Sequence, residues 1–190
     1  MKLLKERMLA DGKVLPGGVI KIDSFLNRTV DTALARELAL EWKRRFNGER
    51  ITKVLTVEAS GIAIAAIVAL ELGVPMVFAR KARSVAASPD TLVSKVVSYT
   101  HGNTYCVSVD REHISDTDRV LIIDDFLANG SALSALVDIC RAANAEVVGA
   151  GVAVEKAYLR GGERIRNAGV RVESLARLGA ALDNGKIEFV

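Results

Sequence analysis

The sequence predicts an α/β fold, a doubly wound parallel sheet with helices on both faces. Short apolar runs that are rich in β-branched residues alternate with helical patterns over most of the chain, and the length of 190 residues suits one compact domain. Strands that are apolar on both faces are typical of a parallel sheet covered on both sides. The predicted strands span residues 54–57, 74–78, 120–123, 147–154 and 170–175.

The predicted helices have recognisable ends. An Ala/Ile-rich segment opens at Ser60 and ends at Gly73, and a further helix spans about residues 131–143. Ahead of the first strand, apolar residues recur every four positions from Leu34 to Phe46, which indicates a helix that packs on the core. Helix therefore follows strand along most of the chain.

Two segments depart from this alternation. Residues 92–100 and 104–110 alternate around a turn at 101–103, which predicts an extended hairpin within a flexible loop at about 82–110. The first thirty residues contain a short helix at 3–9 and a strand at 19–23. Long connections beyond a sheet commonly act as lids or binding segments. We expect one domain over residues 1–190, with a hairpin lid and a small hood formed by residues 1–30 and the C-terminal segment.

Composition excludes several classes of protein. The net charge of +3 lacks the dense clustering of a nucleic-acid surface. The longest apolar run, residues 62–70, falls well short of the ~18 residues that a membrane span needs. Cys106 and Cys140 form no CxxC pattern, and both lie in apolar surroundings. We expect a cytoplasmic protein that binds neither nucleic acid nor membrane.

The strongest chemical signal follows the predicted strand at 120–123. This strand runs directly into Asp124 and Asp125, and a short loop with Asn129 and Gly130 then leads to a helix that begins at Ser131. Ligands of doubly wound sheets bind at the carboxyl ends of the strands. The free N–H groups of the helix start suit a phosphate, and the carboxylates suit ribose hydroxyls or a developing positive charge. A plain strand–turn–helix connection is the structural alternative.

This stretch resembles the phosphoribosyl-pyrophosphate (PRPP) signature of the type I phosphoribosyltransferases, an apolar run followed by Asp-Asp and then Gly-Ser/Thr. The resemblance extends from about residue 15 to 190 and points to the xanthine-using bacterial members of that family. Further matching segments are residues 22–27, 58–62, 78–81 and 171–178.

The resemblance implies a role for each PRPP-site residue. Asp124 and Asp125 would be the catalytic pair that holds the ribose hydroxyls. The 5′-phosphate would lie on the loop Ala128, Asn129, Gly130, Ser131 and Ala132. The pyrophosphate would lie on the turn Glu58, Ala59, Ser60 and Gly61 beside the cations Arg80 and Lys81. Ala59 departs from the pattern, in which serine is commoner, and this puts only a side-chain contact in doubt.

The resemblance also implies a purine site beneath the hood. Ile20 and Asn27 would contact the base, and Lys156 would meet its 6-oxo group. The expected reaction transfers the phosphoribosyl group of PRPP to xanthine, giving xanthosine 5′-monophosphate (XMP) and pyrophosphate. Mg²⁺ would be held mainly by PRPP and not by protein ligands, and the expected partner is a second copy of the chain in a homodimer.

Two alternatives remain open. The base could be guanine or hypoxanthine, because an amide and a lysine also suit other 6-oxo purines. The chain could instead be a non-catalytic regulator that senses PRPP. The DNA-binding regulators of this fold carry a domain in front, whereas the expected hood starts within about fifteen residues of Met1. The enzyme is therefore the favoured reading.

Overall fold

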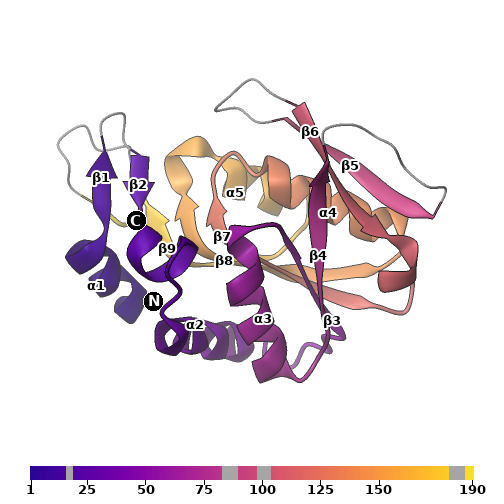
Figure 1. Ribbon diagram of the computed structural model, residues 1–190, viewed down its shortest axis with the longest axis horizontal. Coiled ribbons are helices and arrows are strands. Elements are labelled where there is room, and N and C mark those ends of the chain that lie inside the picture. Colours follow the sequence, from indigo (N-terminus) through magenta and orange to yellow (C-terminus); the bar gives the residue numbers. More distant parts are fainter. Residues whose placement is uncertain (16–18, 83–89, 98–103, 180–186) are drawn as a thin grey trace.

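The computed structural model describes residues 1–15, 19–82, 90–97, 104–179 and 187–190 (Figure 1). A seven-stranded sheet with the order β5-β6-β4-β3-β7-β8-β9 forms its centre, and a separate two-stranded hairpin, β1-β2, lies near the N-terminus. The strands are β1 (Lys13–Leu15), β2 (Val19–Lys21), β3 (Lys53–Val57), β4 (Met76–Ala82), β5 (Thr91–Val97), β6 (Thr104–Asp110), β7 (Arg119–Leu127), β8 (Glu146–Lys156) and β9 (Val172–Leu178). The α-helices are α1 (Lys2–Asp11), α2 (Thr32–Arg45), α3 (Ser60–Leu72), α4 (Ser131–Ala142) and α5 (Gly161–Asn167).

The predicted parallel sheet is confirmed. Strands β4, β3, β7, β8 and β9 run parallel, and β3 lies between β4 and β7. After β3 the chain moves to β4 on one side, and it later returns to β7 on the other side. The carboxyl ends of β3 and β7 therefore form the point where the strand order reverses, which is the usual ligand site of a doubly wound sheet.

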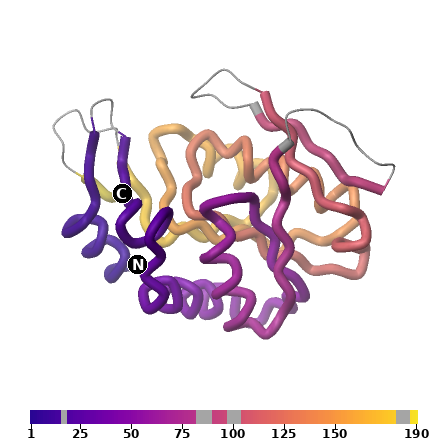
Figure 2. Tube along the Cα trace, viewed as in Figure 1, coloured from indigo at the N-terminus to yellow at the C-terminus, as the bar shows by residue number. Residues whose placement is uncertain are grey.

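Each face of the sheet has its own apolar core, and Figures 1 and 2 show the helices packed around the sheet. Helices α1, α2 and α3 pack on one face with buried side chains such as Trp42 and Ile64. Helix α4 packs on the other face through Leu133, Leu136 and Ile139, and α5 adds Ile165. Because both faces are covered, the central strands are apolar on both sides, which is the pattern that predicted them.

The predicted hairpin is an extension of the central sheet. Strands β5 and β6 pair antiparallel, and β6 pairs with the end of β4 through Arg80–Ala82. Leu92 and Val109 are buried beneath α4, which explains why these strands belong to the sheet and do not stand apart from it. The predicted turn at 101–103 lies outside the described residues, as do residues 83–89 of the predicted flexible loop.

The N-terminal segment packs beside the chain's C-terminal end. Leu4 and Met8 of α1 are fully buried, and the amino group of Met1 donates to the carbonyl of Leu175 in β9. Lys5 lies 4.9 Å from the ring centre of Phe189, close to the C-terminus. Among the described residues, every helix is too short or too polar to cross a membrane.

Besides two single 3₁₀ turns at Arg111–His113 and Ala157–Leu159, three elements were not predicted. They are β1, helix α5 and a π-helical turn at Asp23–Asn27 that extends the chain beyond β2. Each is too short to establish a period of its own, so the apolar pattern carries little information there. The π-helical turn matters for the site, because Asn27 is its last residue.

Candidate active site

The connection from β7 to α4 has the shape that a phosphate site requires. Gly130 adopts φ of 80°, a left-handed conformation that favours glycine, and it precedes the first turn of α4. Oδ1 of Asn129 accepts a hydrogen bond of 3.1 Å from the backbone N–H of Ser131, which holds the loop in shape. The N–H groups at the start of a helix, together with the Ser131 hydroxyl, attract an anion.

Two carboxylates lie buried at the end of β7. Asp124 is 7% exposed and Asp125 is 5% exposed. The backbone N–H of Asp125 donates to Oδ1 of Asp124 at 3.0 Å. Burial, and next the charge of Asp125, raise the pKa of Asp124 well above its ordinary value, whereas Lys81 acts in the opposite direction. A positive charge that develops beside this pair would therefore be strongly stabilised.

Asn27 links the N-terminal segment to this carboxylate pair. Its Nδ2 donates a hydrogen bond of 2.8 Å to Oδ2 of Asp125. Its Oδ1 is buried and has no hydrogen-bond partner within the part of the chain that the structure describes. A buried oxygen without a partner is costly, so this acceptor suits a ligand donor.

The end of β3 lies against the same carboxylates. The Glu58–Ala59 peptide bond is cis, and Ser60 and Gly61 open α3. A Cβ at Gly61 would overlap Oγ1 of Thr56 and lie 3.2 Å from Oδ1 of Asp124. Glycine at position 61 therefore allows the start of α3 to approach the end of β7 closely. The Thr56 hydroxyl is buried without a partner among the described residues.

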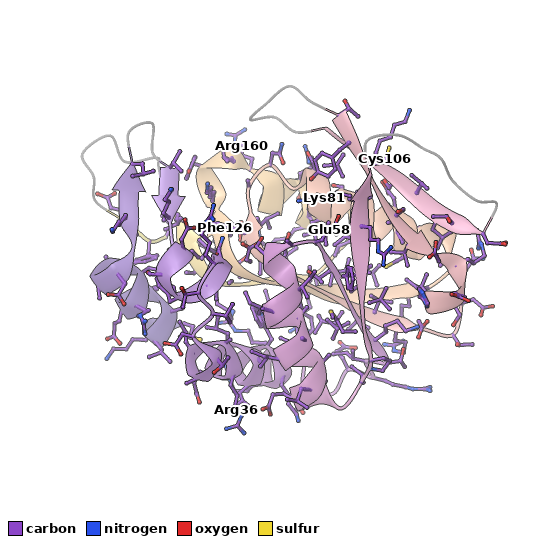
Figure 3. The ribbon with its side chains drawn as sticks, viewed as in Figure 1. Arg36, Glu58, Lys81, Cys106, Phe126 and Arg160 are labelled. Atoms are coloured by element: carbon purple, nitrogen blue, oxygen red, sulfur yellow. The ribbon has the colours of Figure 1, made fainter. Side chains whose placement is uncertain are left out.

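The neighbouring cations Arg80 and Lys81 point to opposite faces of β4, as successive residues of a strand do. Lys81 pairs in register with the buried Val107, and its Nζ lies 5.5 Å from the ring centre of Tyr105. Its backbone N–H donates to Oε1 of Glu58 at 2.5 Å, and Figure 3 shows the two residues side by side. The charge of Lys81 thus acts on Asp124 of the same chain.

Arg80 is not brought to the carboxylate pair. It pairs in register with Ser108 and lines a groove of about 450 Å³ on the face of β4 and β6 that is opposite α4. Met76, Phe78 and His113 line the same groove. Period-two alternation along β4, which the sequence displays, would have separated Arg80 from Lys81.

Lys156 is the last residue of β8 and lies at the same edge of the sheet as the Asp pair. Its Nζ lies 5.2 Å from the ring centre of Phe126. Burial lowers the pKa of Lys156, and the charge of Asp125 opposes this effect, which places the ammonium group within the field of the carboxylates. Ile20 of β2 is buried in the apolar cluster against which Phe126 packs. Figure 3 shows Phe126 and Arg160 on the same edge of the sheet as Glu58 and Lys81.

Sequence reasoning missed Thr56 and Tyr105. Thr56 lies in a strand that reads as uniformly buried, and nothing in the sequence marks its hydroxyl as unpaired. Burial, and next the charge of Asp124, raise the pKa of Tyr105, so the phenol lies near the carboxylate pair. The alternation along β6 could have placed Tyr105 on the same face as the buried Val107, although not beside Asp124.

The residues suit a divalent cation that arrives with its substrate. Among the described residues, no three His, Cys, Asp or Glu side chains gather into a group that could hold a metal alone. Mg²⁺ usually keeps several waters and is held by one or two carboxylates together with substrate phosphates. Asp124 and Asp125 could supply one or two carboxylates of this kind.

The fold and the Asp-Asp loop define the class of protein. The model of the phosphoribosyl transferase domain matches residues 30–173, so the chain belongs to the phosphoribosyltransferase family. Curated relatives are more specific. The chain is 49% identical to the xanthine phosphoribosyltransferase of a Bacillus cereus strain and 48% identical to that of Bacillus mycoides, in each case over all of this chain and 96% of the relative.

Solved structures show the same architecture. The adenine phosphoribosyltransferase of Giardia lamblia, solved with 9-deazaadenine, superposes with a TM-score of 0.79 at 24% identity and covers 93% of this chain and 98% of its own. The adenine phosphoribosyltransferase of Rhodothermus marinus superposes with a TM-score of 0.75 at 26% identity, covering 94% of this chain and 100% of its own. The predicted fold class is therefore confirmed.

Proposed function

We propose that this protein transfers the phosphoribosyl group of PRPP to xanthine and releases XMP and pyrophosphate. The full-length similarity to xanthine phosphoribosyltransferases supports the reaction. The observation that carries the choice of base is the position of Asn27, which is hydrogen-bonded to Asp125 and keeps a buried acceptor free. A site that is built to satisfy polar edges of its substrate discriminates strongly against analogues that lack them.

The loop and the carboxylates bind different parts of PRPP. The 5′-phosphate lies on the loop 128–132, where backbone N–H groups and the Ser131 hydroxyl donate to it. Asp124 and Asp125 accept hydrogen bonds from the ribose hydroxyls. As the bond from C1 to pyrophosphate breaks, positive charge develops on the ribose. Asp124 then stabilises that charge in surroundings from which water is excluded.

The opposite end of PRPP lies against the turn 58–61. Lys81 neutralises part of the pyrophosphate charge, and Glu58 holds the Lys81 backbone through its carboxylate. Mg²⁺, when bound with PRPP, would withdraw negative charge from the leaving group, and the neighbouring carboxylates would hold its water ligands. These residues stabilise the negative charge that develops on the leaving pyrophosphate.

The base lies between the N-terminal segment and the end of β8. Lys156 donates to the 6-oxo group, which suits xanthine and not the amino group of adenine. Asn27 offers both a donor and an acceptor to the remaining polar edge of the base. Ile20 contributes an apolar side chain above the ring. The single domain over residues 1–190, its hood and the cytoplasmic location remain predictions from the sequence.

We also propose that the chain acts as a homodimer through the groove that Arg80 lines. Met76 and Phe78 line this groove together and Phe78 is 37% exposed, so the groove offers an apolar patch that a partner could cover. In such a dimer Arg80 would reach the partner's pyrophosphate site. We expect Arg80→Ala and Asp124→Asn each to be impaired alone and their mixture to regain activity through mixed dimers, and no regain would contradict this role.

The test of the reaction is nucleotide formation from PRPP and Mg²⁺ with xanthine, guanine, hypoxanthine and adenine measured in parallel. A clear preference for xanthine supports the proposal. Faster turnover of guanine or hypoxanthine would keep the mechanism and remove the base assignment of Asn27, whereas faster turnover of adenine would also remove that of Lys156. Binding of PRPP without turnover of any base would indicate the PRPP-sensing regulator.

A further inference from the structure

The first turn of α5 presses directly on the loop assigned to the 5′-phosphate. A Cβ at Gly161 would overlap the carbonyl oxygen of Ala128 and lie 2.5 Å from C of Asn129 and from N of Gly130. All three contacts are with backbone atoms, so no side-chain rotation could relieve them. Position 161 therefore accepts only glycine if the loop is to keep its shape.

The contact is reciprocal. A Cβ at Gly130 would lie 3.1 Å from the carbonyl oxygen of Gly161 and 3.3 Å from Cγ1 of Ile165. Ile165 is buried in the core beneath α4 and so fixes the middle of α5. The loop is thus confined between α4, which it starts, and α5, against which it lies.

An ion pair between a buried carboxylate and a partly exposed arginine fixes α5 to the sheet. Glu155 in β8 is 1% exposed, and both of its oxygens accept hydrogen bonds from Arg166 of α5, at 2.9 and 2.8 Å. The Ser174 hydroxyl of β9 donates to Oε2 of Glu155 at 2.5 Å, and Arg177 lies 3.3 Å from the same oxygen. Burial raises the pKa of Glu155, but the hydrogen bonds from Arg166 and Ser174 outweigh this and leave it lowered.

A second glycine lets this ion pair fit under the same turn. A Cβ at Gly162 would overlap Oε1 of Glu155 and lie 2.6 Å from NH1 of Arg166. Glu155 is held by several bonds at once, so it could not move aside at little cost. The two adjacent glycines thus face different partners, the phosphate loop and the ion pair.

We infer that Gly161 is a positioning residue for the 5′-phosphate of PRPP, held against the loop 128–132 by the Glu155–Arg166 pair. The inference rests on the proposed function, because that function assigns the loop to the phosphate. A loop fixed from behind presents its N–H groups in the bound geometry before the ligand arrives, which lowers the entropic cost of binding. The pyrophosphate turn 58–61 belongs to other strands and receives no such support from α5.

The test separates the two ends of PRPP. Dissociation constants for ribose 5-phosphate and for pyrophosphate with Mg²⁺ are measured by calorimetry on the full chain. In Gly161→Ala we expect the constant for ribose 5-phosphate to rise at least tenfold and that for pyrophosphate to stay within twofold. The matched control is Glu163→Ala, an exposed position in the same helix, for which both constants stay within twofold.

Each outcome decides the inference. An unchanged ribose 5-phosphate constant in Gly161→Ala, or an equal rise in both constants, overturns it. If Gly161→Ala does not fold, as judged by thermal melting, Arg166→Lys replaces it, because lysine keeps the charge but loses the two-pronged bond to Glu155. A selective rise of threefold or more supports the inference there, and no rise overturns it. Failure of the wild-type protein to bind ribose 5-phosphate would instead overturn the proposed function.

Discussion

Nδ2 of Asn27 donates a hydrogen bond of 2.8 Å to Oδ2 of Asp125, across 98 positions of sequence. The bond joins the π-helical turn of the N-terminal segment to the end of β7. In the proposed reaction Asn27 faces the purine and Asp125 faces the ribose. The two reactants therefore meet at a single hydrogen bond, and the segment that covers the base is held by a residue of the sugar site.

The first prediction concerns the choice of base. In Asn27→Ala the polar edge of xanthine loses its partner, and leaving a buried polar group unpaired costs about 1–3 kcal/mol. The ratio of kcat/KM for xanthine to that for hypoxanthine should fall by about 5–150-fold. The strand backbone still places Asp125, so the Kd for PRPP should change far less. An unchanged ratio would remove Asn27 from the base site.

The sequence predicted what lies contiguous in the chain and little of what meets through folding. Asp124 and Asp125 are adjacent and end a buried strand, so the proposed sugar site could be predicted from a single segment. Gly61 and the 128–132 loop follow strands in the same way. The bond of Asn27 to Asp125 depends on an unpredicted π-helical turn. Without the family resemblance, Asn27 would have read as an ordinary turn residue.

The sequence also did not predict where two backbone segments come into close contact. Gly161 and Gly162 are visible in the sequence, but no local pattern says which chain segment a glycine must admit. Helix α5 covers fewer than three turns, so its period was too short to detect. The sequence therefore did not predict that α5 supports the proposed phosphate loop, although both glycines can be read in it.

A second prediction separates the effect of Asp124 on turnover from its effect on PRPP binding. Asp124→Asn removes the charge that stabilises the developing cation on the ribose. Loss of one preorganised electrostatic group typically costs about 10²–10³-fold in kcat. The Kd for PRPP should change much less, because asparagine still accepts a hydrogen bond from a ribose hydroxyl. Steady-state rates and calorimetry on the same preparation test this, and near-normal turnover would exclude the charge-stabilising role.

A third prediction concerns the pH dependence of stability in the same variant. In the folded protein the pKa of Asp124 is raised by burial and by Asp125, so ionisation is harder there than in the unfolded chain. The wild type should lose stability as the pH rises from the ordinary aspartate value through the raised one. Asp124→Asn lacks this loss. Its melting temperature should exceed that of the wild type at pH 7–8, and the difference should shrink toward pH 4. A wild type that melts higher at pH 8 would contradict the burial cost.

A fourth prediction concerns Lys156 and the 6-oxo group. Lys156→Met keeps much of the apolar stem beside Phe126 but removes the cation. The ratio of kcat/KM for xanthine to that for adenine should fall at least tenfold, because the donor that selects an oxo group is gone. Lys156→Arg is the control that keeps a cation. Equal ratios in Lys156→Met and the wild type would place the lysine outside the base site.

The last prediction concerns the close approach at Gly61. In Gly61→Ala the new methyl would overlap Oγ1 of Thr56 and press on Oδ1 of Asp124, which lies 3.2 Å from the added Cβ position. We expect kcat/KM to fall at least tenfold and the melting temperature to drop, since overpacking a tight contact costs about 1–3 kcal/mol. The double variant Thr56→Ala with Gly61→Ala removes the overlapping oxygen and should regain most of the melting temperature. If the double variant melts no higher than Gly61→Ala alone, the contact with Thr56 is not the cause, and the close packing of α3 on β7 has another origin.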